Sequence, residues 1–251
     1  MRDINPPREV GSTPTLSTNL HSWSHEQTQG HPEVGADYGE TRFSEVLTMI
    51  KTKTLRCWIG WLGIALPWIV LVLSFAFGYD MPDSISATYF RDPCITPFMI
   101  ILGSAGILLF NYSGYDLTDN ILNSFAGGFA WGICLFPCAA TTLERVGTFQ
   151  IPTNVSNVFH MIFALAFFGI LAYNSLFQFT KGSDNPTPNK LKRNVIFRVC
   201  GIGMIAIFAL MPFVSIFNIH GGTWFVEMVA LTFFGVSWMT KANKYSWLFA
   251  D

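Results

Sequence analysis

The chain has 251 residues, of which 51% are hydrophobic and only 12% are charged. Soluble domains carry about 25% charged residues, so this composition excludes an ordinary soluble protein. The formal net charge of −1 lacks the basic excess that a nucleic-acid-binding surface needs, and we expect no nucleic-acid partner. The partner that the composition predicts is the lipid bilayer.

The first 54 residues differ in character from the rest of the chain. Residues 1–44 are rich in Pro, Gly, Ser and Thr and hold few large apolar side chains, so they cannot bury enough surface to offset the entropy of the chain. Residues 43–53 have the pattern of a short amphipathic helix that leads into a membrane. We therefore predict that residues 1–54 form a disordered cytoplasmic tail that ends in this amphipathic segment.

Six apolar segments follow, and each is long enough to cross a bilayer. A transmembrane helix needs about 20 mostly apolar residues to cross a hydrocarbon core about 30 Å thick, and soluble helices rarely stay apolar on every face for that length. The sequence therefore predicts an all-α, polytopic membrane domain over residues 55–240, followed by a short cytoplasmic tail, residues 241–251. The six predicted spans are residues 55–78, 93–112, 121–140, 155–179, 195–217 and 222–240.

The basic residues outside the spans lie on one side of the predicted membrane. Of the 15 Lys and Arg residues, two, Arg91 and Arg145, follow the first and third spans. The other 13 precede or begin the first span, lie between the fourth and fifth spans or at the start of the fifth, or follow the sixth. Because cytoplasmic loops carry an excess of Lys and Arg, both termini are predicted to be cytoplasmic. We expect a multi-pass protein of the cell membrane or of an inner membrane.

Small residues indicate a close contact between helices in the third span. Gly128 and Gly132 form a GxxxG pattern, which lets two helix backbones approach closely. Packing inside a single bundle is the interpretation that we favour. The alternative is that two copies of the chain associate through the Gly128/Gly132 face.

Two ionisable residues lie within predicted spans, where a charge costs about 2.5–3.5 kcal/mol at the helix centre. Glu227 lies in the sixth span and His160 in the fourth, both near the outer side if the predicted orientation holds. Such residues usually face a cavity or a partner, so both are candidate ligand-binding residues. The alternative interpretation is that each forms hydrogen bonds to neighbouring helices.

The loop before the second span adds polar residues on the same side. It is dense in hydroxyl and charged groups, and together with Glu227 and His160 it predicts an outward-facing polar pocket. The candidate ligand-binding residues of this loop are Ser84, Ser86, Tyr89, Arg91 and Asp92. No pattern typical of a catalytic triad, a zinc site or a phosphate-binding loop occurs, so the sequence assigns no catalytic residue, metal ligand or cofactor.

Several short motifs resemble those of a family of uncharacterised bacterial membrane proteins with six spans. The shared motifs are an SIS-x-x-Tyr element (Ser84 to Tyr89) before Arg91, a Tyr-x-Gly-Tyr turn (Tyr112 to Tyr115), the pair Ala126-Gly127 and a Leu-Phe-Pro span end (Leu135 to Pro137). The resemblance is best over residues 84–180. It implies a six-span architecture, and the family carries no established activity.

The chain is also distantly similar to the intramembrane hydrolases that include alkaline ceramidases and adiponectin-type receptors. That likeness implies seven spans and a zinc ion held by three histidines, two of them in an HxxxH motif. Here the spans contain a single histidine, His160, and no HxxxH. Ser86, Asp92 and His160 are the nearest counterparts, and no metal-ligand role is transferred to them.

Three functions remain open at this stage. The leading hypothesis is a multi-pass membrane protein that binds a small molecule, an ion or a lipid headgroup in the outward-facing pocket. The first alternative is an intramembrane hydrolase of lipid amides or esters, and the second is a structural or accessory membrane subunit. The sequence thus leaves open whether the protein is an enzyme.

Overall fold

The structure is a computed structural model that describes residues 34–139, 142–182 and 185–243, and of the side chains before Lys51 it describes only that of Thr48. Contacts divide the chain into two units, Met1–Thr41 and Arg42–Asp251. In the first unit the described residues begin helix α1. The predictions made for residues 1–33 and 244–251 lie outside the described residues.

The described part of the chain is almost entirely helical. A two-residue antiparallel pairing, in which Arg145 faces Pro152 and Val146 faces Ile151, forms the one sheet among the described residues. The elements are α1 (Val34–Ala76), the 3-10 helix η1 (Ser86–Phe90), α2 (Asp92–Phe110), α3 (Leu117–Leu135), β1 (Arg145–Val146), β2 (Ile151–Pro152), α4 (Thr153–Tyr173), the π-helical turn η2 (Asn174–Gln178), α5 (Pro188–Phe208), α6 (Met211–Ile216) and α7 (Gly222–Lys241).

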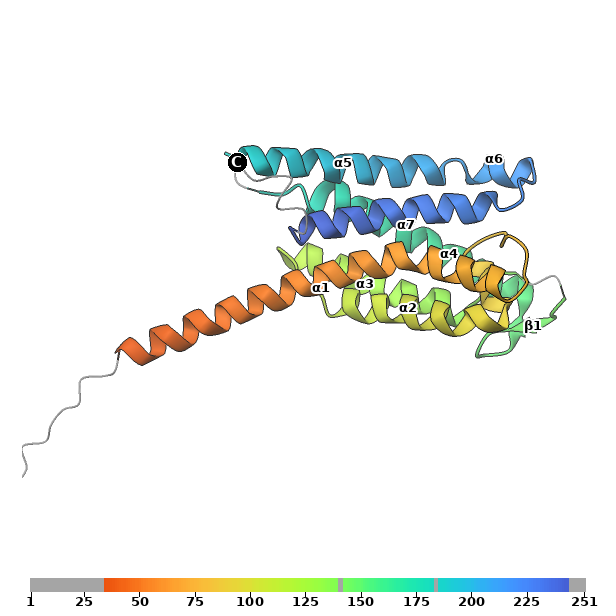
Figure 1. The fold of residues 1–251 in the computed structure, drawn as a ribbon, viewed down its shortest axis with the longest axis horizontal. Helices are drawn as coiled ribbons and strands as arrows, with labels where there is room; N and C mark the ends of the chain where they lie inside the picture. The colour runs from red at the N-terminus through yellow and green to blue at the C-terminus, as the bar shows by residue number, and fades with distance from the viewer. Residues whose placement is uncertain (1–33, 140–141, 183–184, 244–251) are drawn as a thin grey trace, which may run out of the picture. The chain divides into compact units, whose positions relative to one another are not determined.

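Within the second unit the long helices run side by side in alternating directions (Figure 1). Helix α2 packs against α3, α3 against α4, and α5 against α7. The connections 77–91, 136–152 and 217–221 lie at one end, called the loop end below. The connections 111–116 and 179–187 lie at the other, together with the Lys51 end of the α1 span and the end of α7; this is the basic end.

Among the described residues, five helices are long and apolar enough to cross a membrane. They are Lys51–Ala76, Asp92–Phe110, Thr153–Gln178, Pro188–Ile216 and Gly222–Lys241. They correspond to all the predicted spans except the third. Helix α3, which occupies that position, falls short because Asp119, Asn120 and Asn123 lie in its first two turns.

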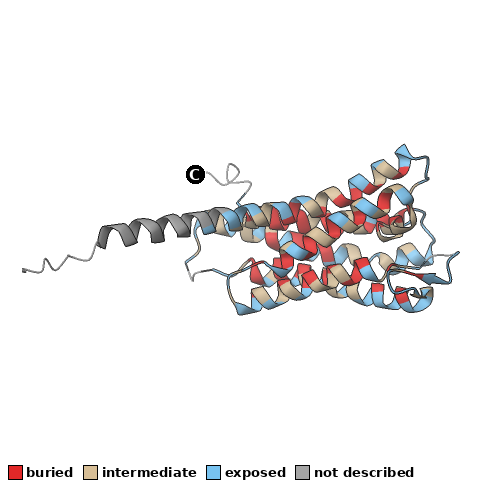
Figure 2. Cartoon of the chain, turned by 90° about the horizontal axis from the view of Figure 1, so that it is seen from below, coloured by how far each residue is buried: buried red, intermediate tan, exposed pale blue. Residues whose placement is uncertain are grey.

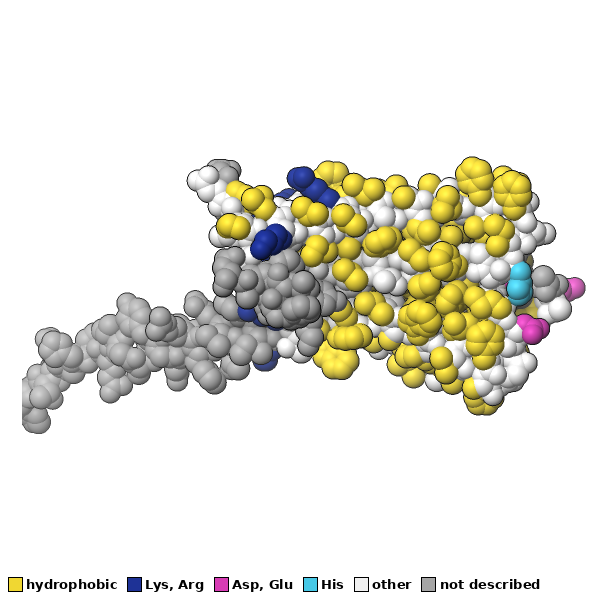
Figure 3. Space-filling model, turned by 45° about the horizontal axis from the view of Figure 1, so that its top comes forward, with side chains coloured by type: hydrophobic (Ala, Val, Ile, Leu, Met, Phe, Trp, Pro, Cys, Tyr) yellow, Lys and Arg dark blue, Asp and Glu magenta, His cyan; other side chains and the backbone are white. Residues whose placement is uncertain are grey.

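The surface of the bundle is also that of a membrane protein. On the outer faces of α4 and α5, the side chains of Met161, Leu165, Val199 and Ile202 are each more than half exposed. Figure 3 shows hydrophobic side chains covering the middle of one face, with Lys and Arg at the basic end and His, Asp and Glu at the loop end. Water would disfavour so large an apolar surface, whereas a lipid bilayer matches it.

The interior of the bundle is aromatic at the basic end. Trp238 of α7 is fully buried and makes edge-to-face contacts with Tyr112 and Phe179, at ring-centroid distances of 5.0 and 5.3 Å. Figure 2 shows buried residues on the helix faces that turn toward one another. These contacts hold the 111–116 turn and the end of η2 against α7.

Several boundaries differ from the sequence prediction, among them the start of α5 at Pro188, where the fifth span was predicted to begin at residue 195. Helix α1 begins at Val34, so residues 34–44, which were predicted to be disordered, are helical, and the helix continues through Pro67. Helix α3 ends at Leu135 and not at residue 140, because Pro137 has no N–H to donate to the Ile133 carbonyl. The fifth predicted span is interrupted after Phe208, between α5 and α6, just before Pro212, which cannot donate a backbone hydrogen bond.

Candidate functional site

A cavity of about 720 Å³ lies toward the loop end of the bundle. Four of the seven candidate residues line it: Ser84, Ser86, His160 and Glu227. The other polar residues of its lining are Thr223, Ser215 and Cys138. Its apolar residues are Leu66, Ile85, Phe98, Leu102, Ile133, Met161, Ile162, Ala164, Leu165, Phe167, Phe168, Phe208, Met211, Pro212 and Leu231.

The Glu227 carboxylate is bound by the backbone of the loop before α2. The N–H of Ile85 donates to Glu227 Oε2 at 2.5 Å, and the N–H of Ser86 also bonds to this carboxylate. These amides lie at the start of η1, where no residue of the helix itself accepts from them. Glu227 therefore holds the SIS element against α7, and its carboxylate borders the cavity.

The hydroxyl groups of this element have local partners. Ser84 Oγ accepts from the N–H of Ala87 at 2.9 Å, and Thr88 Oγ1 donates to the Ile85 carbonyl at 2.6 Å. Both contacts shape the turn that carries η1. Ser84 and Ser86 thus reach the cavity from a backbone that Glu227 and their own neighbours fix.

His160 bonds to the end of helix α3. Its Nδ1 lies 2.8 Å from the Phe136 carbonyl oxygen, and because a carbonyl only accepts, Nδ1 carries the hydrogen. The imidazole also interacts with the Ile133 carbonyl, which Pro137 leaves without a helical donor. One turn earlier on α4, Ser156 Oγ donates to the Pro137 carbonyl at 2.7 Å. The first turns of α4 therefore satisfy the carboxyl end of α3.

Three candidate residues lie outside the cavity lining. Arg91 donates from Nη1 to the Asp80 carbonyl at 2.7 Å and lies over the Tyr79 ring, so it is bound within its own loop. Asp92 is exposed in the first turn of α2. Tyr89 packs edge-to-face on Phe98, and burial raises the pKa of its phenol, which therefore stays neutral at physiological pH.

The sequence reasoning missed most of the cavity wall. The predicted site residues were chosen for their polar side chains. The largest share of the lining consists of aliphatic and aromatic side chains of α4, α5 and α6. The break between α5 and α6, which Pro212 marks in the sequence, supplies Phe208, Met211 and Ser215 to this wall. An apolar wall in an apolar span carries no periodic signal that distinguishes it from a packed face.

The cavity opens on the side of the bundle. Met161 and Leu165 of α4 line it and are 58% and 71% exposed. Pro212 and Ser215 of α6 also line it and are exposed. An opening between α4 and α6 at this depth faces lipid in an embedded protein.

The chemistry of this lining is that of a binding site with one acid. Hydrogen-bond acceptors and hydroxyl groups gather near Glu227, and neither Lys nor Arg is among the described residues that line the cavity. Within residues 34–139, 142–182 and 185–243, no group of three or more His, Cys, Asp and Glu side chains is arranged to hold a metal ion.

No family model, curated protein or solved structure matches this chain. The resemblances to the bacterial six-span family and to the intramembrane hydrolases therefore stay predictions from the sequence.

Proposed function

We propose that the protein is a six-span integral membrane protein that binds an amphipathic molecule in the cavity beside Glu227. The alternating direction of the helices supports α3 as the sixth crossing, because α3 lies between α2 and α4 and runs the length of the bundle (Figure 1). Two of its polar residues, Asp119 and Asn123, are fully buried within the protein, where they are shielded from lipid.

The main support for this proposal is that the described lining of the cavity is mostly apolar and holds a single carboxylate, that of Glu227. Phe167, Phe168 and Leu231 offer an apolar surface for a hydrocarbon chain, whereas Glu227, Ser84 and Ser86 offer acceptors and hydroxyl groups for a polar head. Because neither Lys nor Arg is among the described residues of the lining, this carboxylate favours a head that donates hydrogen bonds or carries positive charge, and disfavours an acid.

The lateral opening supports a ligand that comes from the bilayer. A hydrocarbon chain passing between α4 and α6 would leave lipid for an apolar wall without crossing water, while its head reached Glu227. We infer that the ligand is a lipid-like molecule with a hydroxyl or amine head. Arg91, which lies outside the cavity lining, has no part in this assignment.

Photolabelling tests the proposal. The probe is a long-chain amino alcohol with a diazirine in its chain, applied to the full chain in phosphatidylcholine nanodiscs, and labelled peptides are mapped by mass spectrometry. We expect labelling of the α4 and α6 residues of the cavity. Glu227→Gln should reduce it by about tenfold or more, because a charge-assisted hydrogen bond contributes about 1.5–3 kcal/mol. The Gln carbonyl oxygen still accepts from the Ile85 N–H, so the loop keeps that hydrogen bond to α7.

Glu144→Gln is the matched control, because Glu144 is exposed in another connection of the loop end and does not line the cavity. This variant should label like the unchanged protein. A fatty acid of the same chain length and diazirine position should label the cavity weakly. Equal labelling of the Glu227→Gln variant, or equal labelling by the acid, would overturn the proposal.

A further inference from the structure

A second cavity lies at the basic end, far from Glu227 along the helices. It has a volume of about 330 Å³. Helices α1, α5 and α7 and the connection between η2 and α5 all contribute to its wall. The basic residues that line it are Arg56, Lys181, Lys190, Arg193 and Lys241, and of the described residues no Asp or Glu does so.

Aromatic rings and backbone groups hold two of the lysines at the wall. Lys190 Nζ donates to the Phe179 carbonyl at 2.8 Å and lies 5.8 Å from the centroid of the Phe197 ring. Lys241 Nζ lies 4.6 Å from the centroid of the Phe179 ring. These contacts are electrostatically favourable but leave the positive charge of both lysines intact.

The two arginines have neutral partners. Arg56 donates from Nε to the hydroxyl of Tyr112 at 3.2 Å. Arg193 donates to the side-chain oxygen of Asn243. Each guanidinium has five N–H donors, so one neutral contact leaves most of them available to an anion.

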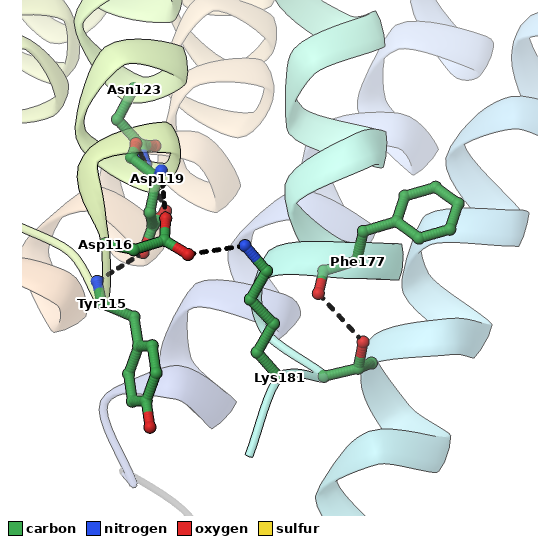
Figure 4. A network of polar contacts seen from close by, with 7 residues as sticks. Tyr115, Asp116, Asp119, Asn123, Phe177 and Lys181 are labelled. Carbon is green, nitrogen blue, oxygen red and sulfur yellow. Dashed lines mark hydrogen bonds and ion pairs between the residues drawn. The ribbon is translucent and has the colours of Figure 1, made fainter.

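Two described carboxylates lie near this cavity, and Figure 4 shows both beside Lys181. Asp116 forms an ion pair with Lys181 at 2.7 Å. Asp119 accepts from the Tyr115 N–H at 2.9 Å and from Asn123 at 2.8 Å, and its charge also attracts that of Lys241. Of the described carboxylates, Asp116 is the one that pairs with a cation of this cavity.

The positive-inside pattern explains the excess of Lys and Arg at the basic end. It does not explain why five of these residues line a single cavity. Lys192 and Arg198 lie on the same helix as Lys190 and Arg193, yet they are exposed and do not line the cavity. Bringing like charges together in a partly desolvated hollow is unfavourable unless an anion completes it. Basic pockets between membrane helices on the cytoplasmic side are suited to phosphorylated headgroups.

We propose that this cavity binds a phosphate group. The arginine forks and lysine ammonium groups match the oxygens of a dianionic phosphate. The phosphate belongs either to the headgroup of a membrane lipid or to a soluble phosphate compound, because both present the same chemistry to these side chains.

Two probes distinguish these sources. Inorganic pyrophosphate is titrated into the full chain in detergent, and phosphatidylinositol 4-phosphate is added to the full chain in phosphatidylcholine nanodiscs. Binding of pyrophosphate assigns the site to a soluble phosphate compound. Binding of the lipid but not of pyrophosphate assigns the site to a headgroup. Either result supports the proposal.

Paired variants of α5 test whether the cavity itself binds. The double variant Lys190→Gln, Arg193→Gln and the control Lys192→Gln, Arg198→Gln each remove two charges from the same helix. We expect the first to weaken binding by about tenfold or more, because it removes charge-assisted hydrogen bonds. The control should bind within about twofold of the unchanged protein, because these charges lie outside the cavity.

Two results would overturn the proposal. One is that the unchanged protein binds neither probe. The other is that both double variants weaken binding equally, which is the result of diffuse attraction to a basic surface. Circular dichroism and gel filtration check that the variants fold, and Lys241→Gln replaces the first double variant if that one does not.

Discussion

At the scale of single residues, the two ionisable side chains within the spans form hydrogen bonds with backbone groups. Glu227 binds the amides of Ile85 and Ser86, and His160 binds the carbonyls that end α3. The sequence singled out both residues because a charge in lipid needs a partner. The partners could not be predicted from the sequence, because each lies on another helix or loop. Which groups meet depends on how the helices pack in the bundle.

Asp116 illustrates a residue whose role changes with pH. Its carboxylate accepts from the Asp119 N–H at 2.8 Å at the start of α3 and pairs with Lys181. The hydrogen bond from Lys181, followed by that from the Asp119 N–H, holds the pKa of the carboxyl below its ordinary value of 3.8. The ionised form therefore stabilises the fold, fully above pH 3.8 and decreasingly as pH falls through the lower folded-state pKa.

We predict that Asp116→Asn causes a small loss of stability at neutral pH that shrinks as the pH falls below 3.8. Asn caps a helix about as well as Asp, so the variant removes the ion pair and keeps the cap. Unfolding titrations from about pH 7 to about pH 3 measure the difference. Lys181→Gln, which removes the other partner, should show the same dependence. A difference that grows toward low pH would contradict this assignment.

At the scale of helices, the closest contacts are made by glycines other than those of the GxxxG pattern. A Cβ on Gly127 would lie 2.5 Å from the Gly106 carbonyl oxygen, so α2 and α3 touch at their backbones there. Gly132 meets the Phe163 ring of α4, whereas a Cβ on Gly128 would meet nothing within 4 Å. The pattern predicted close packing in the right helix but could not tell which face turns inward. Association of two copies through the Gly128/Gly132 face stays a prediction.

Neighbouring glycines provide a matched test of that contact. We predict that Gly127→Ala lowers the free energy of unfolding by about 1–3 kcal/mol, because backbone atoms of α2 cannot move aside for the methyl group. Gly128→Ala should change it little or raise it slightly, because Ala favours the helix more than Gly does. Denaturation in sodium dodecyl sulfate, followed by circular dichroism, compares the two. Similar losses in both variants would contradict the α2–α3 contact.

The interiors of the spans were easier to predict than their ends. The final span was predicted as residues 222–240 and is observed as Gly222–Lys241, because Gly221 adopts a positive φ just before it and Lys241 closes its last turn. The end of α3 was placed five residues too late. The span was extended past Pro137 because the residues around it are apolar, although a proline ends the hydrogen-bonding pattern of the preceding turn.

At the scale of the whole molecule, hydrophobicity predicted the helical membrane class, while the site required the fold. Residues 84–86, 160 and 227 are far apart in the chain, and the structure brings them to one cavity. Arg91 and Asp92, only a few residues further along, lie outside its lining. Which of these loop residues reach the cavity depends on the turn of η1, and this turn cannot be predicted from the composition of the loop.

The number of crossings is the central claim at this scale. Five helices of the described part of the chain qualify by length and apolarity, and the proposed sixth crossing, α3, buries Asp119 and Asn123 in the protein interior. The turn before α3 contains the exposed Tyr115, and the connection after it contains the exposed Glu144. If α3 crosses the bilayer, these two residues lie on opposite sides.

Cysteine labelling in intact cells tests this claim most directly. A membrane-impermeant maleimide is applied to cells that express the Tyr115→Cys or the Glu144→Cys variant, with the unchanged protein as the control for its own five cysteines. The six-span account predicts that the cysteine at position 144 is labelled from outside, and that the cysteine at position 115 is labelled only after permeabilisation. Labelling of both positions from the same side would contradict it.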